Sequence, residues 1–255
     1  MKWLFLFFAL PGFAVYVGNP ADPAIMNTGF FSSSYPFFKC TSGYIYDYTS
    51  NKRYEADTQI DPIRKFGLHS QLASVSLILL ERVQLFGSAG GSKEMVHEGP
   101  PPSFSDLVFD FQSSYQFAWS TGGKAILVEL GTLYLSADFT YFAVPSSPKT
   151  YFKFLNRLNL PLSEEKQKLS LREWQASLGL SLRLFFLTPY AGTSYLHSRL
   201  HIQQGPDTPA ILYHNAVNWG FFYGITASLT GRLHVNFERR VRDEFAYTIS
   251  TIAVF

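Results

Sequence analysis

Apolar and polar residues alternate one for one along much of this chain. In residues 171–184 every second residue from Trp174 to Leu184 is apolar, and the residues between them are polar, charged or glycine. The same alternation recurs in residues 115–127, 133–141, 217–229 and 233–241. A period of two indicates β-strands with one apolar face. The chain is therefore predicted to be all-β and antiparallel.

We predict about 12 strands, within a range of 10 to 16, because single-chain bacterial barrels have an even number of strands. The expected strands are residues 26–35, 41–50, 53–61, 69–80, 83–92, 111–127, 131–144, 169–184, 187–200, 216–229, 231–241 and 245–255.

The N-terminus has the features of a secretory signal peptide. Lys2 precedes an apolar run from Trp3 to Leu10, and the small-residue site Gly12-Phe13-Ala14 follows. We expect cleavage to remove residues 1–14 and leave one domain over residues 15–255. No later segment has 18 consecutive apolar residues, which excludes a spanning helix by composition. An exported soluble β-protein and a membrane β-barrel remain.

The connections between predicted strands fall into two classes of length. The short ones are Glu81–Arg82, Val128–Gly131, Phe185–Leu187, Thr230–Gly231 and Arg242–Glu244. The long ones are residues 93–109, 145–168 and 200–215. Short turns at one end and long loops at the other are typical of outer-membrane barrels. We predict a transmembrane up-and-down β-barrel with short periplasmic turns and long external loops, of which 145–168 is the best candidate to fold inward.

Four blocks resemble one family in order along the chain. They are VGNPADPAIM (17–26), residues 113–149, EWQASLGLSLRLFFLTPYAG (173–192) and HVNFERRVRDEFAYTISTIAVF (234–255). All four are similar to segments of the chlamydial major outer membrane porins. The resemblance implies a passive aqueous channel for small solutes, a homotrimer, and residence in the bacterial outer membrane. The family's major member is rich in cysteine and longer, whereas this chain has only Cys40, whose role the sequence leaves open, and shorter loops.

In a barrel in lipid, the polar face of each strand lines the lumen. The expected pore-lining residues are Lys124, Asp138, Glu173, Gln175, Arg183, Arg232, His234, Asn236, Glu238 and Arg240. Four of these are positive and three negative, so we expect at most a weak preference for anions. Small residues on the same face, such as Ser177 and Gly179, favour an open lumen. Arg at Ser177 should then leave folding intact, whereas Arg at Leu178 should not.

The apolar face should contact lipid and lipopolysaccharide. Trp119, Trp174 and Trp219 lie on this face and are the expected interfacial girdle. The chain stops at Phe255, with Tyr247 and Ile249 on the same face of the last predicted strand. Tyr247, Ile249 and Phe255 look like the signal that the barrel-assembly machinery reads.

The same residues also bear on functions other than that of a channel. A structural or adhesin barrel without conductance is the main alternative, because a barrel fold alone does not determine function. An enzyme is not expected: His197, His201 and His214 lie near one end with Asp207 and Asp106, but no spacing joins them into a motif. No cofactor or metal motif is present, and the net charge of +2 argues against a nucleic-acid partner. A soluble periplasmic β-protein is the least favoured reading.

Overall fold

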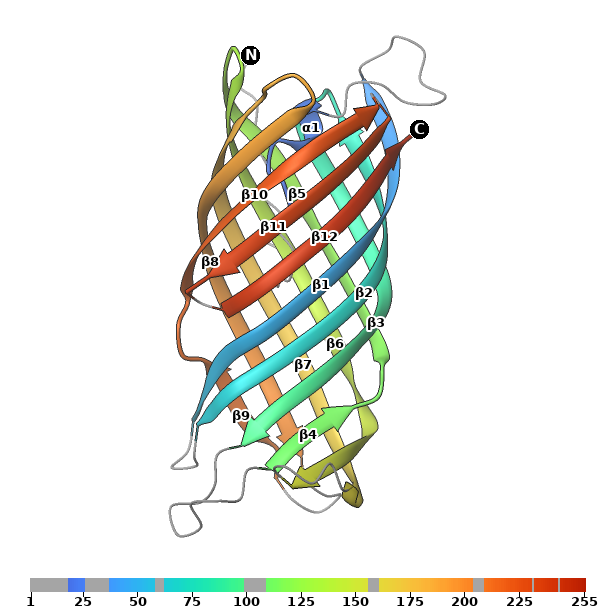
Figure 1. Ribbon diagram of the computed structural model, residues 1–255, viewed down its shortest axis with the longest axis vertical. Helices are drawn as coiled ribbons and strands as arrows, with labels where there is room; N and C mark the ends of the chain where they lie inside the picture. The colour runs from blue at the N-terminus through green and yellow to red at the C-terminus, as the bar shows by residue number, and fades with distance from the viewer. Residues whose placement is uncertain are drawn as a thin grey trace, which may run out of the picture.

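The computed structural model describes residues 18–25, 37–57, 62–98, 109–155, 161–203, 209–230, 232–242 and 244–255. Within these ranges twelve antiparallel strands form one sheet that closes into a barrel (Figure 1). The predicted signal peptide, residues 1–14, and the predicted strand 26–35 lie outside the described residues. None of the helices in the described part of the chain has the length and apolar character that crossing a membrane requires.

The elements follow one another along the chain as one short helix and then strands. They are α1 (Asp22–Ile25), β1 (Phe38–Ala56), β2 (Ile63–Leu79), β3 (Val83–Glu98), β4 (Phe109–Ser113), β5 (Gln116–Leu130), β6 (Leu133–Leu155), β7 (Pro161–Leu182), β8 (Leu187–Gln203), β9 (Ile211–Asn215), β10 (Trp219–Thr230), β11 (Leu233–Val241) and β12 (Glu244–Val254).

Ten of the described strands complete the circuit of the barrel wall. Their order around the wall is β1, β2, β3, β5, β6, β7, β8, β10, β11 and β12, and β12 pairs with β1 from Thr41 to Lys52. Every wall strand therefore has two neighbours. Closure matters because an unpaired strand edge cannot be hydrated inside a bilayer.

The wall narrows toward one end. The β11–β12 hairpin stops at Arg242, and beyond it β1 pairs directly with β9, from Tyr54 to Ala56. β9 continues the line of β10 beside β8, and β4 continues the line of β5 beside β3. Losing β11 and β12 reduces the ten strands to eight at this end. In Figure 1 this narrow part lies at the bottom, with β4 and β9.

Two of the predicted strands are one strand. Residues 41–50 and 53–56 belong to β1, which runs without interruption past an irregularity between Thr49 and Asn51, and residues 58–61 of the second predicted strand lie outside the described residues. The opposite error occurs at 111–127, where β4 and β5 are separate, and β9 was not predicted at all. The error in β1 has a physical cause: a β-bulge breaks the alternation of side chains without breaking the strand.

Four short connections lie at the same end of the barrel, here called the turn end. They join β2 to β3, β5 to β6, β7 to β8 and β10 to β11, and both Phe38 and Val254 lie at this end (Figure 1, top). The turn at Arg242, predicted to lie with them, faces the opposite end, here called the loop end. Antiparallel order requires this, because β11 runs away from the turn end.

The prediction that residues 145–168 form a loop folded into the barrel is wrong. Residues 145–155 complete β6 and residues 161–168 begin β7, and the two strands pair with each other across this region. The other long connections, 93–109 and 200–215, also begin and end in strand. At the loop end, much of what we predicted to be loop is therefore strand, and these strands lengthen the barrel wall.

The outer wall carries an apolar band. Leu178, Leu180 and Leu184 on the β7 side are 45%, 51% and 48% exposed, as a lipid-facing surface requires. From Trp174 to Leu184, at about 3.3 Å per residue and a tilt of about 40°, the band covers about 25 Å along the barrel axis. That is close to the height of the apolar band of outer-membrane barrels.

The three tryptophans predicted for the girdle lie on this outer face and close to one another. Trp119 stacks on Tyr141 with ring centroids 4.5 Å apart, and Trp174 and Trp219 both contact Tyr195, at 5.1 and 5.3 Å. They form an aromatic belt at the loop-end margin of the apolar band. The strands beyond this belt extend past the band toward the loop end.

Candidate functional site in the barrel interior

Eight of the ten predicted pore-lining side chains are buried inside the barrel. They are Lys124, Asp138, Glu173, Gln175, His234, Asn236, Glu238 and Arg240. The other two, Arg183 and Arg232, lie at the turn end, where Arg183 is half-buried and Arg232 is exposed. The inward face is thus the polar face, and it is closely packed rather than open to water.

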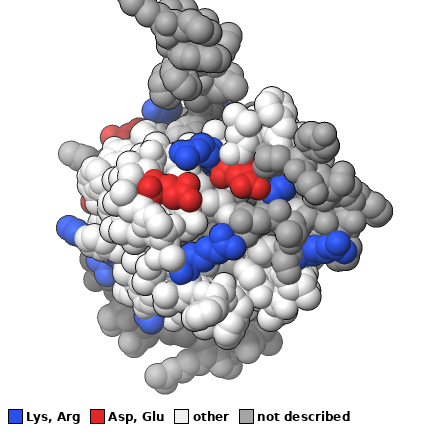
Figure 2. Space-filling view, turned by 90° about the horizontal axis from the view of Figure 1, so that it is seen from above, with Lys and Arg blue, Asp and Glu red and all other residues white. Residues whose placement is uncertain are grey.

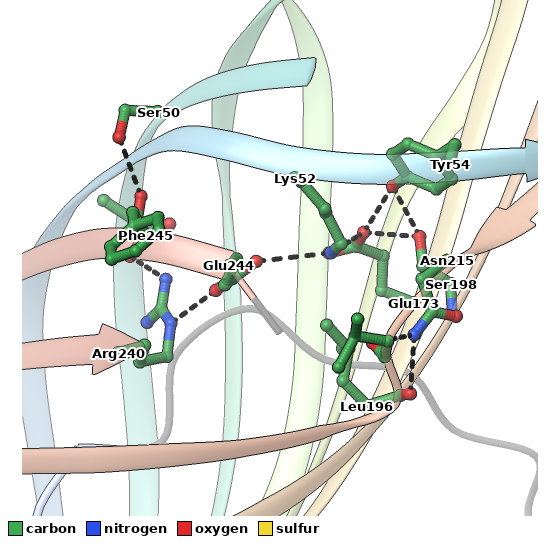
Figure 3. Close-up of polar contacts among 12 residues, drawn as sticks. Ser50, Lys52, Tyr54, Glu173, Leu196, Ser198, Asn215, Arg240, Glu244 and Phe245 are labelled. Carbon is green, nitrogen blue, oxygen red and sulfur yellow. Dashed lines mark hydrogen bonds and ion pairs between the residues drawn. The ribbon is translucent and has the colours of Figure 1, made fainter. Parts of the chain in front are cut away.

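Arg240 is the centre of the interior charge network (Figure 3). Its guanidinium lies 2.7 Å from Asp47, 3.3 Å from Glu238 and 2.6 Å from Glu244, and it donates a 2.9 Å hydrogen bond to Thr248. The Arg240 side chain is 1% exposed. Guanidinium geometry suits several carboxylates at once, and burial without them would be costly.

Glu244 links this cluster to a second one. Lys52 Nζ lies 3.3 Å from Glu244 and 2.5 Å from Glu173. Glu173 also accepts hydrogen bonds from the hydroxyls of Tyr54, at 3.1 Å, and Ser198, at 2.6 Å. The result is a continuous chain of ion pairs and hydrogen bonds that crosses the interior (Figure 3).

Sequence reasoning missed four members of this network: Asp47, Lys52, Tyr54 and Glu244. For Lys52 and Tyr54 the reason lies in an irregularity of β1. Asp47 and Thr49 point inward, but the irregularity before Asn51 shifts the alternation, so that Lys52 and Tyr54 are the next inward residues. A strict period of two would have turned Lys52 outward. Only the pairing of β1 with β2 and β12 reveals the shift.

A hydrophobic cluster fills the interior of the narrow, eight-stranded part and extends into the ten-stranded wall, where Ile45 lies opposite Ser250 of β12 and Ala118 belongs to β5. Its members are Ile45, Tyr54, Ile63, Phe66, Leu68, Leu72, Val96, Ala118, Phe142, Val144, Leu169, Leu171, Leu200, Ile202 and Tyr213. About eight strands enclose just enough space for side chains to fill. The loop end is therefore sealed by apolar packing beyond the charge network.

Residues 18–25 fill the interior at the turn end. Residues 18–23 are buried, and α1 lies against the wall within this end of the barrel (Figure 1). Asp22 forms a 2.6 Å ion pair with Lys124, and Asn19 donates to Thr226 and accepts from Ser181, at 3.0 and 2.8 Å. The segment is thus held by charge and hydrogen bonds on several strands.

The small inward residues make room for protein rather than for water. A Cβ added to Gly179 would lie 2.9 Å from Pro20 and 3.1 Å from the ring of Phe222. The space that suggested an open lumen is occupied by the N-terminal segment and by Phe222. One interior cavity, beside Asp22 and Lys124, has a volume of about 30 Å³, which suits about one water molecule.

The interior carries more acid than base among the described residues. The buried acidic side chains are Asp22, Asp47, Glu94, Asp138, Glu173, Glu238 and Glu244, and the buried basic ones are Lys39, Lys52, Lys124 and Arg240. The excess of carboxylates differs from the expected weak preference for anions. Figure 2 looks onto the turn end and shows both acidic and basic side chains there, not a ring of one sign.

The histidines weighed as part of an enzyme lie on the wall, outside this network. His197 and His201 belong to β8 and His214 to β9, where His214 Nδ1 lies 2.9 Å from Asp57. Asp207 and Asp106 fall outside the described residues. In the ranges that the structure describes, no three His, Cys, Asp or Glu side chains gather as a metal site would require.

Comparison with known sequences connects the chain to one group of proteins. It is 31% identical to the major outer membrane porin, serovar D, of Chlamydia trachomatis, over 44% of this chain and 35% of that protein. It is 26% identical to the major outer membrane porin of Chlamydia psittaci, over 48% of this chain and 37% of that protein. The chain is a distant homologue of the chlamydial major outer membrane porins and spans about a third of their length. No protein-family model matches it.

Solved structures with a related shape are outer-membrane barrels. The outer membrane protease OmpT of Escherichia coli aligns with a TM-score of 0.44 and 11% identity, over 86% of this chain and 96% of that one. The translocator domain of the autotransporter NalP of Neisseria meningitidis aligns with a TM-score of 0.41 and 8% identity, over 89% and 90%. The present chain is a closed antiparallel β-barrel whose sequence is distantly related to chlamydial major outer membrane porins.

Proposed function

We propose that this protein is an outer-membrane barrel that is closed to solutes and serves the envelope as a structural barrel, not as an open diffusion pore. The observation that carries the proposal is the filled interior. Three successive barriers occupy it: the N-terminal segment, the charge network around Arg240 and Lys52, and the hydrophobic cluster of the eight-stranded part.

Barrel size supports the same function. Barrels of 16–18 strands leave an aqueous channel, whereas about eight strands leave room only for side chains. The wall here has ten strands and narrows to eight. A hydrated pore would leave inward side chains exposed, yet Gln175, His234 and Asn236 are each 1–2% exposed.

A porin-type channel that opens by displacement of the N-terminal segment is the second candidate. The polar lining between the turn end and the charge network favours it, and so does the homology to porins. Such a channel would also have to open the hydrophobic cluster around Phe66 and Phe142. Because the interior holds an excess of carboxylates, a channel of this kind would prefer cations.

Single-channel recording in planar bilayers tests the two candidates. The wild-type chain, shown to be folded by heat-modifiable migration, is expected to give no conductance steps. The matched variant is Asn19→Ala with Asp22→Ala, which removes the anchors of the N-terminal segment and leaves the hydrophobic cluster in place. It is expected to be silent as well.

Steps from the wild-type protein would overturn the closed barrel in favour of a porin. Steps from the Asn19→Ala, Asp22→Ala variant alone would establish the second candidate, with the N-terminal segment as its gate. In either case the reversal potential in a KCl gradient is expected to show a preference for K⁺ over Cl⁻.

A further inference from the structure

Two arginines face each other on the outer wall just beyond the aromatic belt. Arg172 on β7 and Arg199 on β8 occupy directly paired positions, and both side chains are exposed. Arg172 lies two residues beyond Trp174 toward the loop end, which is about 5 Å further along the barrel axis. Because the end with the long connections is the one expected to face outside the cell, the pair lies at the level where the headgroups of the outer leaflet begin.

The electrostatics of this pair are unfavourable without a partner. Directly opposed side chains on antiparallel strands have Cβ atoms about 5 Å apart, and like charges in such positions destabilise the sheet. Neither arginine has an ion-pair partner among the described residues, and Arg199 Nε donates its hydrogen bond to His197, at 3.2 Å. An anion between the two guanidinium groups would remove the repulsion.

On β7 and β8 near the pair, none of the outward side chains that the structure describes is a carboxylate. On the described outer face of β7 and β8 at this level, the neighbours are Lys168, Ser170, Trp174, Tyr195, His197, His201 and Gln203. On the next strand His214 is already opposed by Asp57, at 2.9 Å, and by Glu55, at 3.9 Å. Burial lowers the pKa of His201, and the charges of Arg172 and Arg199 lower it further. The local potential is thus positive.

Below the pair, the wall is shaped for acyl chains. On the same outer face and toward the turn end, β7 continues with Trp174, Ala176, Leu178 and Leu180. A molecule with an anionic headgroup and several hydrocarbon chains matches both parts. A free anion would match only the arginines.

We propose that Arg172 and Arg199, with His201 beside them, form a binding site for a phosphate group of a phosphorylated outer-leaflet lipid of the lipid A type. The two guanidinium groups bind the phosphate oxygens, since arginine forms paired hydrogen bonds with phosphate. The acyl chains lie on the apolar wall between Trp174 and Leu180. This site depends on the barrel lying in the outer membrane, and it does not depend on whether the interior conducts.

Binding of lipid to the purified full-length barrel in non-ionic detergent tests the site. Bis-phosphorylated lipid A is titrated and the bound fraction is counted by native mass spectrometry. The variant Arg172→Gln with Arg199→Gln is expected to bind about 25-fold more weakly, because each basic side chain at a membrane surface contributes about fivefold to binding of an anionic lipid. Arg172→Lys with Arg199→Lys should retain part of the affinity.

The control variant is Lys65→Gln with Lys93→Gln, which removes two positive charges from β2 and β3 and should bind as the wild type does. Dephosphorylated lipid A should bind weakly to all forms, and inorganic phosphate should not compete at millimolar concentration. Equal losses in both double variants would show only diffuse attraction to the wall and overturn the site. Unchanged binding by the arginine variant, or equally tight binding of dephosphorylated lipid, would also overturn it.

Discussion

Replacement of Arg240 by methionine is expected to destabilise the barrel by about 3–5 kcal/mol, the cost of removing one partner from a buried ion pair. The substitution keeps much of the side chain's length but leaves Asp47, Glu238 and Glu244 together in the interior without their guanidinium. All three carboxyl groups are buried, so water cannot replace the lost partner.

The neighbouring Arg239 provides the matched control. Its guanidinium lies on the outer wall, 5.3 Å from the centre of the Tyr247 ring. Arg239→Met should cost about 0.5–1 kcal/mol, the range of an exposed cation–π contact. Urea unfolding of both variants in lipid vesicles gives the two free energies. Equal losses would mean that the Arg240 network contributes nothing specific to stability.

Arginine in place of Leu178 is expected to destabilise the inserted barrel by about 2–4 kcal/mol. Leu178 is on the outer face near the middle of the apolar band, where a charged side chain has no polar partner. Leu184→Arg is the control, because Leu184 lies on the same face at the turn-end margin of the band, where the cost falls to about 0–1 kcal/mol. The folding yield and the free energy of unfolding in vesicles should both be clearly higher for Leu184→Arg than for Leu178→Arg. The reverse order would show that the bilayer does not surround the wall at the level of Leu178.

Arginine in place of Ser177 should also disrupt folding, contrary to our expectation from the sequence. Ser177 accepts a 3.1 Å hydrogen bond from Gln175, and its side chain is 7% exposed in a packed interior. A larger, charged side chain there would overpack the site. Heat-modifiable migration reports the result: a fully folded Ser177→Arg barrel would show that the interior holds more free space than the structure describes.

The outer and inner faces of the wall could be read from the sequence. Leu178 and Ser177 have opposite environments because neighbouring residues of a strand point to opposite sides, and this depends on nothing further along the chain. The same rule correctly placed Glu173, Gln175, Glu238 and Arg240 inside. It failed at Lys52, because the bulge in β1 changes the phase of the alternation without changing the composition.

The sequence predicted that these interior residues point inward, but it could not predict whether they line an open pore. Alternation predicts that Lys124 points inward, and the structure agrees. It does not predict that Asp22, more than a hundred positions away in the sequence, lies 2.6 Å from Lys124 and occupies the space. Nothing in the residue pattern around Asp22 or around Lys124 indicates that the two side chains form an ion pair.

What the sequence alone determined was the all-β class, the two faces of the wall, the apolar outer band with its three tryptophans, and the relation to chlamydial porins. The tertiary structure alone decided the narrowing from ten strands to eight, the charge network that joins β1 to β7 and β12, and the filled interior. The physical reason is the distance along the sequence over which each feature is determined. A strand's face is set by adjacent residues, whereas the volume of a barrel depends on how many strands pair around it, and on what the rest of the chain places inside.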